Sequence, residues 1–231
     1  MIFQHRLLLI ASLLAAQGLY AGEIQDAVKQ GDVAKVKSLA EADPKLLQSE
    51  PGSWTLLHEA ARNGRKEVAE FLIASKVNID AKDKDAWTPL HVAAQWGQKD
   101  MVKLLLDKDA RVNAHAKDGT TPLHVACSML QTEVAALLIA ARADVSGKDD
   151  SGKIALFHAV QPDQKSITDL GVKPGNQKEL VVMLLKKSNP STMDASGKSL
   201  LKVAEEAGLT EILALLKQAG GKEEEIPPPA Q

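Results

Sequence analysis

The sequence has few aromatic residues, one cysteine and almost no net charge, and each shortage excludes a class of protein. Aromatic residues make up 3% of the 231 residues, which disfavours a β-sandwich or barrel because strands draw on aromatic and β-branched residues. The net charge of −2 argues against a nucleic-acid binder that relies on many phosphate contacts. A hydrophobic content of 45% is too high for a disordered chain. The abundance of Ala, Leu, Lys and Glu favours helix.

One apolar run, from Leu7 to Ala16, lies near the start of the chain. It follows a short segment that contains Arg6 and is followed by small residues, the pattern of a secretory signal peptide. The run is too short to cross a bilayer, which needs roughly 20 residues. We therefore expect a signal peptide over residues 1–21, cleaved after Ala21 or alternatively after Gly18, and no stable membrane anchor after cleavage. An uncleaved amphipathic or buried helix is the other interpretation.

The single cysteine, Cys127, lies far from this apolar run. It cannot form an intramolecular disulfide, and no cysteine follows the run as a site for lipid attachment. An exported chain without disulfides fits the bacterial periplasm better than an animal extracellular space. We expect the protein in the periplasm, with secretion beyond the cell as the alternative.

An internal repeat of 33 residues follows. The string Thr-Pro-Leu-His occupies residues 88–91 and again 121–124, and a variant occupies 55–58 at the same spacing. Each string is followed by small residues and then by a second apolar stripe. These features resemble the ankyrin repeat. The resemblance implies an all-α solenoid of about six helix-turn-helix units with β-hairpin tips.

Individual positions agree with that fold. Thr88 and Thr121 suit the N-cap of a helix, and a proline follows each at the first helical position, where no amide donor is needed. Gly64 and Gly97 suit the left-handed conformation that ends a helix. Leu130 takes the glycine position in the fourth repeat, and we expect the turn there to be built differently.

The repeat pattern divides the mature chain into six units and a tail. The units are an N-terminal capping repeat at 22–50, repeats at 51–83, 84–116, 117–149 and 150–194, and a C-terminal capping repeat at 195–221. The fifth unit carries an insertion at 161–175, which we expect to be a surface loop with either a functional or a neutral role. Residues 222–231 are rich in Glu and Pro, and we expect them to be disordered.

No sequence pattern points to catalysis, a cofactor or a metal. The sequence has no G-x-S-x-G, P-loop or G-x-G-x-x-G motif and no His or Cys pair at metal-binding spacing. The ankyrin resemblance implies that His58, His91 and His124 are buried and bind the backbone of the neighbouring hairpin. We expect Cys127 to be an inert buried thiol and the acidic hairpin residues to be solvated turn formers rather than cation ligands. The chain is therefore not expected to be an enzyme.

The ankyrin resemblance also implies where a partner binds. Ankyrin repeats generally dock partners on the concave side, which is made of the hairpin tips and the outward face of the first helices. Trp and Arg are enriched among interface hot spots, and all three tryptophans fall in this set, although Trp54 and Trp87 could instead shield the tips. The candidate partner-binding residues are Trp54, Arg62, Lys84, Asp85, Trp87, Gln95, Trp96, Lys117, Asp118, Thr120, Met129, Asp150 and Lys153.

These expectations combine into one leading function and two alternatives. The leading function is an exported module, monomeric alone, that binds another periplasmic protein through its concave face. Resemblance to small periplasmic ankyrin proteins implies an inhibitor or self-protection protein for a cell-wall hydrolase. The alternatives are a supporting factor or activator of a periplasmic enzyme, for instance in oxidative-stress defence, and a secreted effector that binds host proteins.

Overall fold

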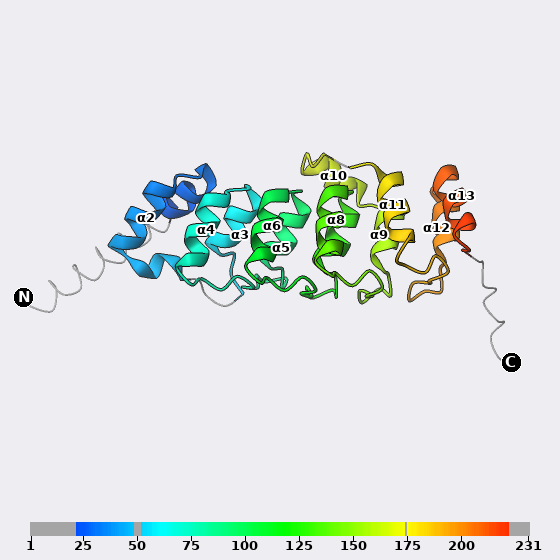
Figure 1. The fold of residues 1–231 in the computed structure, drawn as a ribbon, viewed down its shortest axis with the longest axis horizontal. Coiled ribbons are helices and arrows are strands. Elements are labelled where there is room, and N and C mark those ends of the chain that lie inside the picture. The colour runs from blue at the N-terminus through cyan, green and yellow to red at the C-terminus, as the bar shows by residue number, and fades with distance from the viewer. Residues whose placement is uncertain (1–21, 49–51, 174, 222–231) are drawn as a thin grey trace, which may run out of the picture.

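The structure is a computed structural model that describes residues 22–48, 52–173 and 175–221. The expected signal peptide and C-terminal tail lie outside these residues. Helices and turns make up the described part of the chain, where one isolated bridge, between Met193 and Ser199, is the only strand-like pairing. The helices stand side by side in one elongated row (Figure 1). None of the described helices is long and apolar enough to cross a membrane.

The helices follow one another in pairs along the chain. The first unit is a helix at 22–30 followed by α2 (Val33–Ala42) and the 3₁₀ helix η1 (Pro44–Leu47). The next three pairs are α3 (Leu56–Arg62) with α4 (Lys66–Ala74), α5 (Pro89–Gln95) with α6 (Lys99–Asp107), and α7 (Pro122–Ser128) with α8 (Thr132–Ala140). The last two pairs are α9 (Ala155–Val160) with α11 (Gln177–Leu185), separated by α10 (Gln164–Asp169), and α12 (Leu200–Glu206) with α13 (Thr210–Gln218).

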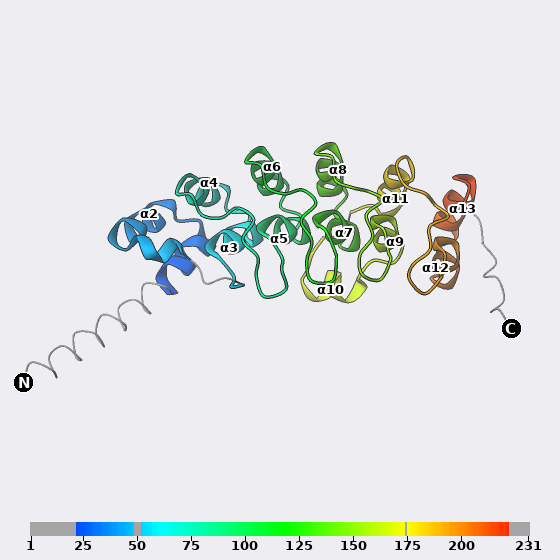
Figure 2. The ribbon, with the colours of Figure 1, turned by 90° about the horizontal axis from the view of Figure 1, so that it is seen from below.

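The pairs form two layers. The first helices α3, α5, α7, α9 and α12 lie in one row and the second helices in the other (Figure 2). Alanines at equivalent positions of three first helices have no exposed surface, which lets neighbouring backbones approach closely; they are Ala60, Ala93 and Ala126. Leu72, Leu105 and Leu138 are fully buried on the second helices, and burying a leucine contributes about 1.5–3 kcal/mol. One continuous apolar core therefore joins the repeats.

The helix ends confirm most of the sequence expectations. Thr88 and Thr121 are N-caps, and the proline after each begins the helix. Gly64 and Gly97 both have φ of +64°, the left-handed conformation that glycine adopts without steric cost. The expectation for Leu130 was wrong: its φ is +53°, so the turn is built in the same way. This conformation costs a residue with a Cβ roughly 1–2 kcal/mol, and the side chain of Leu130 is buried, which offsets that cost.

The expected hairpin tips are loops, each closed at its base by one backbone hydrogen bond, with a second backbone bond inside the loop. Neighbouring tips are joined by a further backbone bond, from Lys117 N–H to Asp85 O at 2.9 Å and from Asp150 N–H to Asp118 O at 3.0 Å. The tips therefore form a continuous row along one edge of the solenoid. The closing bonds run from Asp83 to Trp87, from Ala116 to Thr120 and from Asp149 to Lys153.

The insertion at 161–175 is not an open loop. It contains the helix α10, and Ile167 and Val172 bury their side chains in the core. Its backbone is attached to the preceding repeat at both ends: Asp163 N–H donates to Ser128 O at 3.1 Å, and Gly175 N–H donates to Leu130 O at 2.5 Å. The insertion lies at the surface as expected, but it is partly helical and anchored rather than a plain loop, because Ile167 and Val172 find buried positions.

The bond from Asp163 replaces a side-chain contact that the other repeats use. In three earlier repeats, the residue before the second helix reaches back to a carbonyl of the preceding repeat. These contacts are Arg65 Nε to Lys29 O at 2.7 Å, Gln98 Nε2 to Arg62 O at 3.0 Å, and Gln131 Nε2 to Gln95 O at 3.5 Å. The next carbonyl in this series belongs to Ser128. The insertion therefore takes over a connection that the repeat pattern already contains.

Candidate interaction surface

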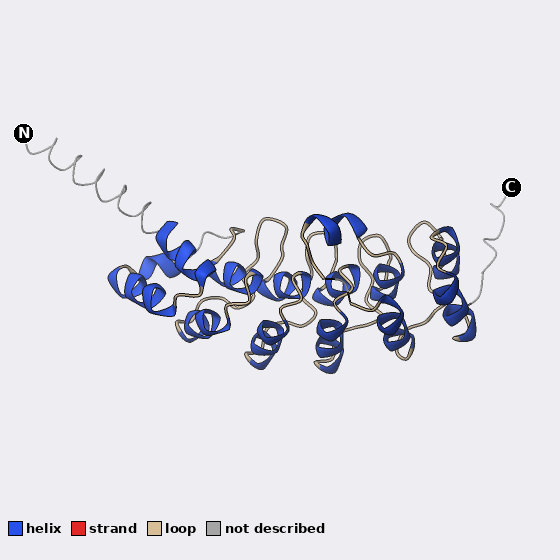
Figure 3. Cartoon of the chain, turned by 90° about the horizontal axis from the view of Figure 1, so that it is seen from above, coloured by secondary structure: helices blue, strands red, loops and turns tan. Residues whose placement is uncertain are grey.

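The tips and the first helices form one face of the solenoid, which we call the concave face. The molecule is bowed, and the tips and the first-helix row lie on its inner side (Figures 2 and 3). The helix α10 lies on the same side as the tips in both views, whereas in Figure 1 it lies at the opposite edge of the row from the tips. The concave face is thus bounded by the tips along one edge and by α10 over part of the other.

Three buried histidines hold the tips against the first helices. The Nε2 atom of each donates to a carbonyl oxygen of the next tip: His58 to Trp87 at 3.0 Å, His91 to Thr120 at 3.2 Å, and His124 to Gly147 and Lys153 at 3.1 and 3.2 Å. At the other side of each ring, Nδ1 accepts the N–H of the N-cap threonine. This arrangement confirms the roles expected for His58, His91 and His124.

The same arrangement requires neutral rings. Burial lowers the pKa of His91 and of His124 to about 4, and it also lowers the pKa of His58. A protonated ring would carry a hydrogen on Nδ1, facing the threonine N–H, and the bond would be lost. The histidines are therefore structural groups, uncharged at neutral pH.

Each tryptophan has a different environment. Trp54 is 41% exposed, its Nε1–H donates to Glu59 Oε2 at 2.8 Å, and its ring lies 5.1 Å from that of His58. Trp96 is half-buried beneath the guanidinium of Arg62, 5.0 Å from the ring centroid. Trp87 is half-buried with its ring 5.8 Å from His91. Trp87 and Trp96 also pack against the core, so these rings have fixed positions.

The candidate partner-binding residues differ in their solvent exposure. Met129 is the exception to the expectation of a surface group, because it is buried with 5% of its surface exposed. The exposed members are Trp54, Arg62, Lys84, Asp85, Lys117, Asp118 and Asp150, and the half-buried members are Trp87, Gln95, Trp96, Thr120 and Lys153.

A pocket of about 240 Å³ brings several candidate residues together between the tips and α10. The tips contribute Trp87, Asp118 and Thr120 to its lining, and the first helices α5 and α7 contribute further residues. The remaining lining residues are Gln95, His124, Val125, Ser128, Met129, His158, Asp163 and Ser166. Five of the thirteen candidates, Trp87, Gln95, Asp118, Thr120 and Met129, therefore share one pocket.

Three of the lining residues were missed by sequence reasoning. His158 Nε2 donates to Asp149 Oδ2 at 2.8 Å, and its ring meets that of His124 edge-on at 5.3 Å. Burial lowers the pKa of His158. Asp163 caps α10 by accepting the N–H and the hydroxyl of Ser166, at 3.1 and 2.5 Å. Two features of the sequence could have indicated these residues: Phe157 at the usual histidine position, which displaces His158 by one, and the insertion that contains Asp163 and Ser166.

The comparisons with known families agree with this architecture. A family model described as ankyrin repeats (3 copies) matches residues 24–116, and one described as ankyrin repeats (many copies) matches residues 96–139. Together the matches run from residue 24 to residue 139, half of the chain. The chain belongs to the ankyrin repeat family. Ankyrin repeats indicate a protein–protein interaction module, typically without catalysis. No curated protein matches the chain.

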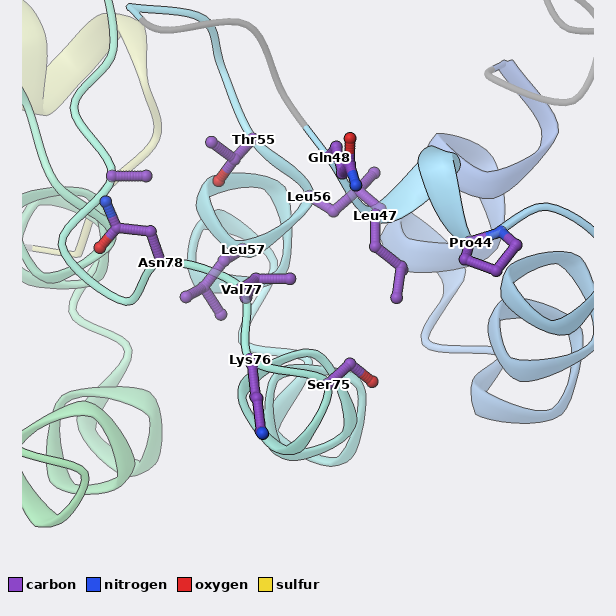
Figure 4. Close-up of a pocket in the computed structure, with 11 residues that line it drawn as sticks. Pro44, Leu47, Gln48, Thr55, Leu56, Leu57, Ser75, Lys76, Val77 and Asn78 are labelled. Carbon is purple, nitrogen blue, oxygen red and sulfur yellow. The ribbon is translucent and has the colours of Figure 1, made fainter.

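A larger pocket of about 570 Å³ lies at the junction of the first two ankyrin units. Leu47, Leu56 and Val77 approach it from three segments, and Lys76 lies at the end of α4 (Figure 4). Among the described residues that line it, Lys76 is the one charged residue, and none is a carboxylate, histidine or cysteine.

The cysteine and the tip aspartates of the ankyrin units have structural roles. Cys127 is fully buried, and burial raises the pKa of its thiol far above the usual range, so the nucleophilic thiolate is suppressed. Asp83 and Asp149 accept backbone N–H groups within their own tips. Within the described ranges, no three His, Cys, Asp or Glu side chains are grouped to hold a metal.

Proposed function

We propose that this ankyrin repeat chain is an exported binding module that docks another periplasmic protein on its concave face. The observation that carries the proposal is the set of tryptophans: Trp54 is the one large hydrophobic residue exposed in the described part of the chain, and Trp87 lines a pocket on the concave face. Fixed aromatic rings contribute large contact areas at interfaces with little loss of conformational entropy.

The charge of the concave face supports a protein partner. Lys84 alternates with Asp85 on one tip, and Lys117 alternates with Asp118 on the next. A mixed-sign rim around aromatic groups fits a protein surface, whereas a polyanion requires a basic stripe. Export is supported by the signal-like pattern at residues 1–21.

Within this function, we infer that the module inhibits a cell-wall hydrolase or protects the cell from one. A bowed face with a pocket suits capping of an active-site cleft on another protein. Activation of the partner is the opposite outcome, and the sign of the change in partner activity separates the two.

The test is capture of the partner from a periplasmic extract. The native chain is compared with a Trp87→Ala, Trp96→Ala double variant, and a Phe71→Ala variant is the matched control. Phe71 is a half-buried aromatic ring with the amine of Lys37 over it at 5.7 Å, but it lies on the second helix α4. We expect the double variant alone to lose the partner. Equal recovery by all three chains, each checked for folding by circular dichroism, would overturn the concave-face assignment.

A hydrolase assay on the captured protein then tests inhibition. Fractionation of cells tests export, since protein in the cytoplasm would contradict it and protein in the medium would favour secretion.

A further inference from the structure

The pocket between the tips and α10 has only acidic groups among its charged lining residues. Asp118 and Asp163 line it, and no lysine or arginine does. The histidines that line it, His124 and His158, have lowered pKa values because they are buried, so they carry no charge at neutral pH. The pocket is thus a negative spot on a face whose tips otherwise mix both signs.

Both carboxylates are held ionised by neighbouring donors. Burial alone would raise the pKa of Asp118, but the hydroxyl and N–H of Thr120 outweigh it and lower the pKa. The Ser166 hydroxyl and N–H lower the pKa of Asp163. Both bonds from Thr120 reach Oδ1 of Asp118, so neither of them occupies its Oδ2.

An aromatic wall completes the pocket. Trp96 shows how this chain pairs a tryptophan with a cation, since the Arg62 guanidinium lies 5.0 Å from its ring centroid. Trp87 has no such partner among the described residues. The ring of Trp87 therefore borders a negative pocket that no cation of this chain occupies.

Three departures from the repeat pattern meet at this pocket. In the neighbouring tips, the carboxylates of Asp83 and Asp149 accept backbone N–H groups of their own tip. Ala116 stands at the equivalent position here, and the carboxylate of Asp118 accepts the N–H of Thr120 instead. His158 lies one position beyond the usual histidine, which Phe157 replaces. The insertion supplies Asp163 and Ser166. The repeat fold does not need these changes, and they add His158, Asp163 and Ser166 to the lining.

We propose that this pocket receives an arginine side chain of the protein partner, with its guanidinium between Asp118 and Asp163 and against the ring of Trp87. A guanidinium is planar, presents five donors to carboxylates and stacks on aromatic faces, whereas an ammonium is a compact, strongly hydrated charge. The volume of about 240 Å³ is below the roughly 300–1,000 Å³ of sites for drug-sized ligands and fits one long side chain. The inference rests on the proposed function, because the arginine belongs to the docked partner.

The test uses nuclear magnetic resonance on the folded chain with N-acetyl-arginine methylamide as the probe. The three tryptophans give three indole N–H signals, each assigned by a Trp→Phe variant. We expect the probe to shift the Trp87 signal at millimolar concentrations and to leave that of Trp54 unchanged. The citrulline analogue, which is nearly the same shape but uncharged, and the lysine analogue are expected to bind at least about tenfold more weakly.

Two sets of variants test whether the charge of the carboxylates is needed for binding while the fold is preserved. The Asp118→Asn, Asp163→Asn double variant keeps an oxygen for the Thr120 turn and for the cap of α10, and we expect it to weaken binding of the arginine probe at least about tenfold. Asp144→Asn is the matched control, because Asp144 is an exposed aspartate that accepts Ser146 N–H in a similar turn and does not line the pocket.

Three results would overturn the arginine assignment: no shift of the Trp87 signal, equal binding of the citrulline or lysine analogue, or undiminished binding by the double variant. Partner capture reports separately on the proposed function. If the native chain captures its partner and the Trp87 variant does not, but the arginine probe fails, the docking face stands and the arginine assignment is wrong. If the probe binds but capture does not depend on Trp87 and Trp96, the pocket stands and the proposed function is wrong.

Discussion

His58 and Trp87 belong to different repeats, yet the ring Nε2 of His58 donates to the main-chain oxygen of Trp87 across 3.0 Å. The histidine is fully buried, and the tryptophan lies at the base of the next tip. Because the same bond recurs from His91 to Thr120, the core of each repeat positions the surface of the following one. Stability and the shape of the concave face are therefore coupled.

This coupling predicts that the protein loses stability in mild acid. The folded-state pKa of His91 and of His124 is about 4, below the value near 6.5 of the unfolded chain. Between these values the unfolded chain binds more protons, so the free energy of unfolding falls as the pH drops from about 6.5 to about 4, by roughly 3 kcal/mol for each histidine. Urea denaturation across this pH range measures the effect.

A histidine substitution tests whether the loss of stability in acid comes from the buried rings. We expect His91→Gln to reduce the dependence of the urea midpoint on pH, whereas His115→Gln keeps it, because His115 is exposed. A midpoint that stays constant from about pH 7 to about pH 4.5 would contradict the neutral-ring arrangement.

Substitution of Gly97 by alanine tests the turns between paired helices. The φ of Gly97 is +64°, and an added Cβ would lie 2.4 Å from Gln131 Oε1. We expect Gly97→Ala to lower the free energy of unfolding by about 2 kcal/mol, from backbone strain and displacement of the Gln131 side chain. In a Gln131→Ala background only the strain of about 1 kcal/mol remains. Equal costs in the two backgrounds, measured by urea denaturation, would exclude the contact.

Gly175 is expected to control attachment of the insertion. A Cβ at this position would lie 2.2 Å from Leu130 O, a main-chain atom that cannot move aside easily. Gly175→Ala should therefore detach this end of the insertion and raise the rate of hydrogen exchange at the α10 amides. Gly171→Asn is the control, because Gly171 has positive φ and open space around it and Asn tolerates that conformation. Unchanged exchange in Gly175→Ala would contradict the attachment.

Cys127 is expected to report global unfolding. Because its side chain is fully buried and burial raises the pKa of its thiol, an aromatic disulfide reagent should react only when the chain opens. We expect the labelling rate in the native state to be at least about a hundredfold below that in urea. Labelling that stays fast under native conditions would show that the fourth repeat opens locally.

The repeat architecture was predictable because its determinants are local. A Thr-Pro pair begins a helix, a glycine ends it, and a 33-residue period sets which alanines and leucines face the neighbouring repeat. The histidine bonds were implied by the family resemblance and are present. Leu130 shows the limit of position-by-position reasoning, since tertiary packing holds a leucine in a conformation that its own propensity disfavours.

The pocket on the concave face was only partly predictable. Trp87, Gln95, Asp118, Thr120 and Met129 were among the candidates, but nothing local indicated that Met129 is buried or that Asp163 and Ser166 join them. Those positions depend on where the insertion folds, and that is decided by burial of Ile167 and Val172 and by the bonds to Ser128 and Leu130.

The number of repeats and the helix pairs follow from short-range patterns that recur every 33 residues, and the burial of the three histidines was implied by the resemblance to the ankyrin repeat. Which departures from those patterns lie next to one another is set by the tertiary fold. Asp118, His158 and Asp163 come from a tip, a first helix and an insertion. They line one pocket because the repeats stack and the insertion folds back onto the preceding repeat, and the 33-residue period says nothing about where the insertion lies.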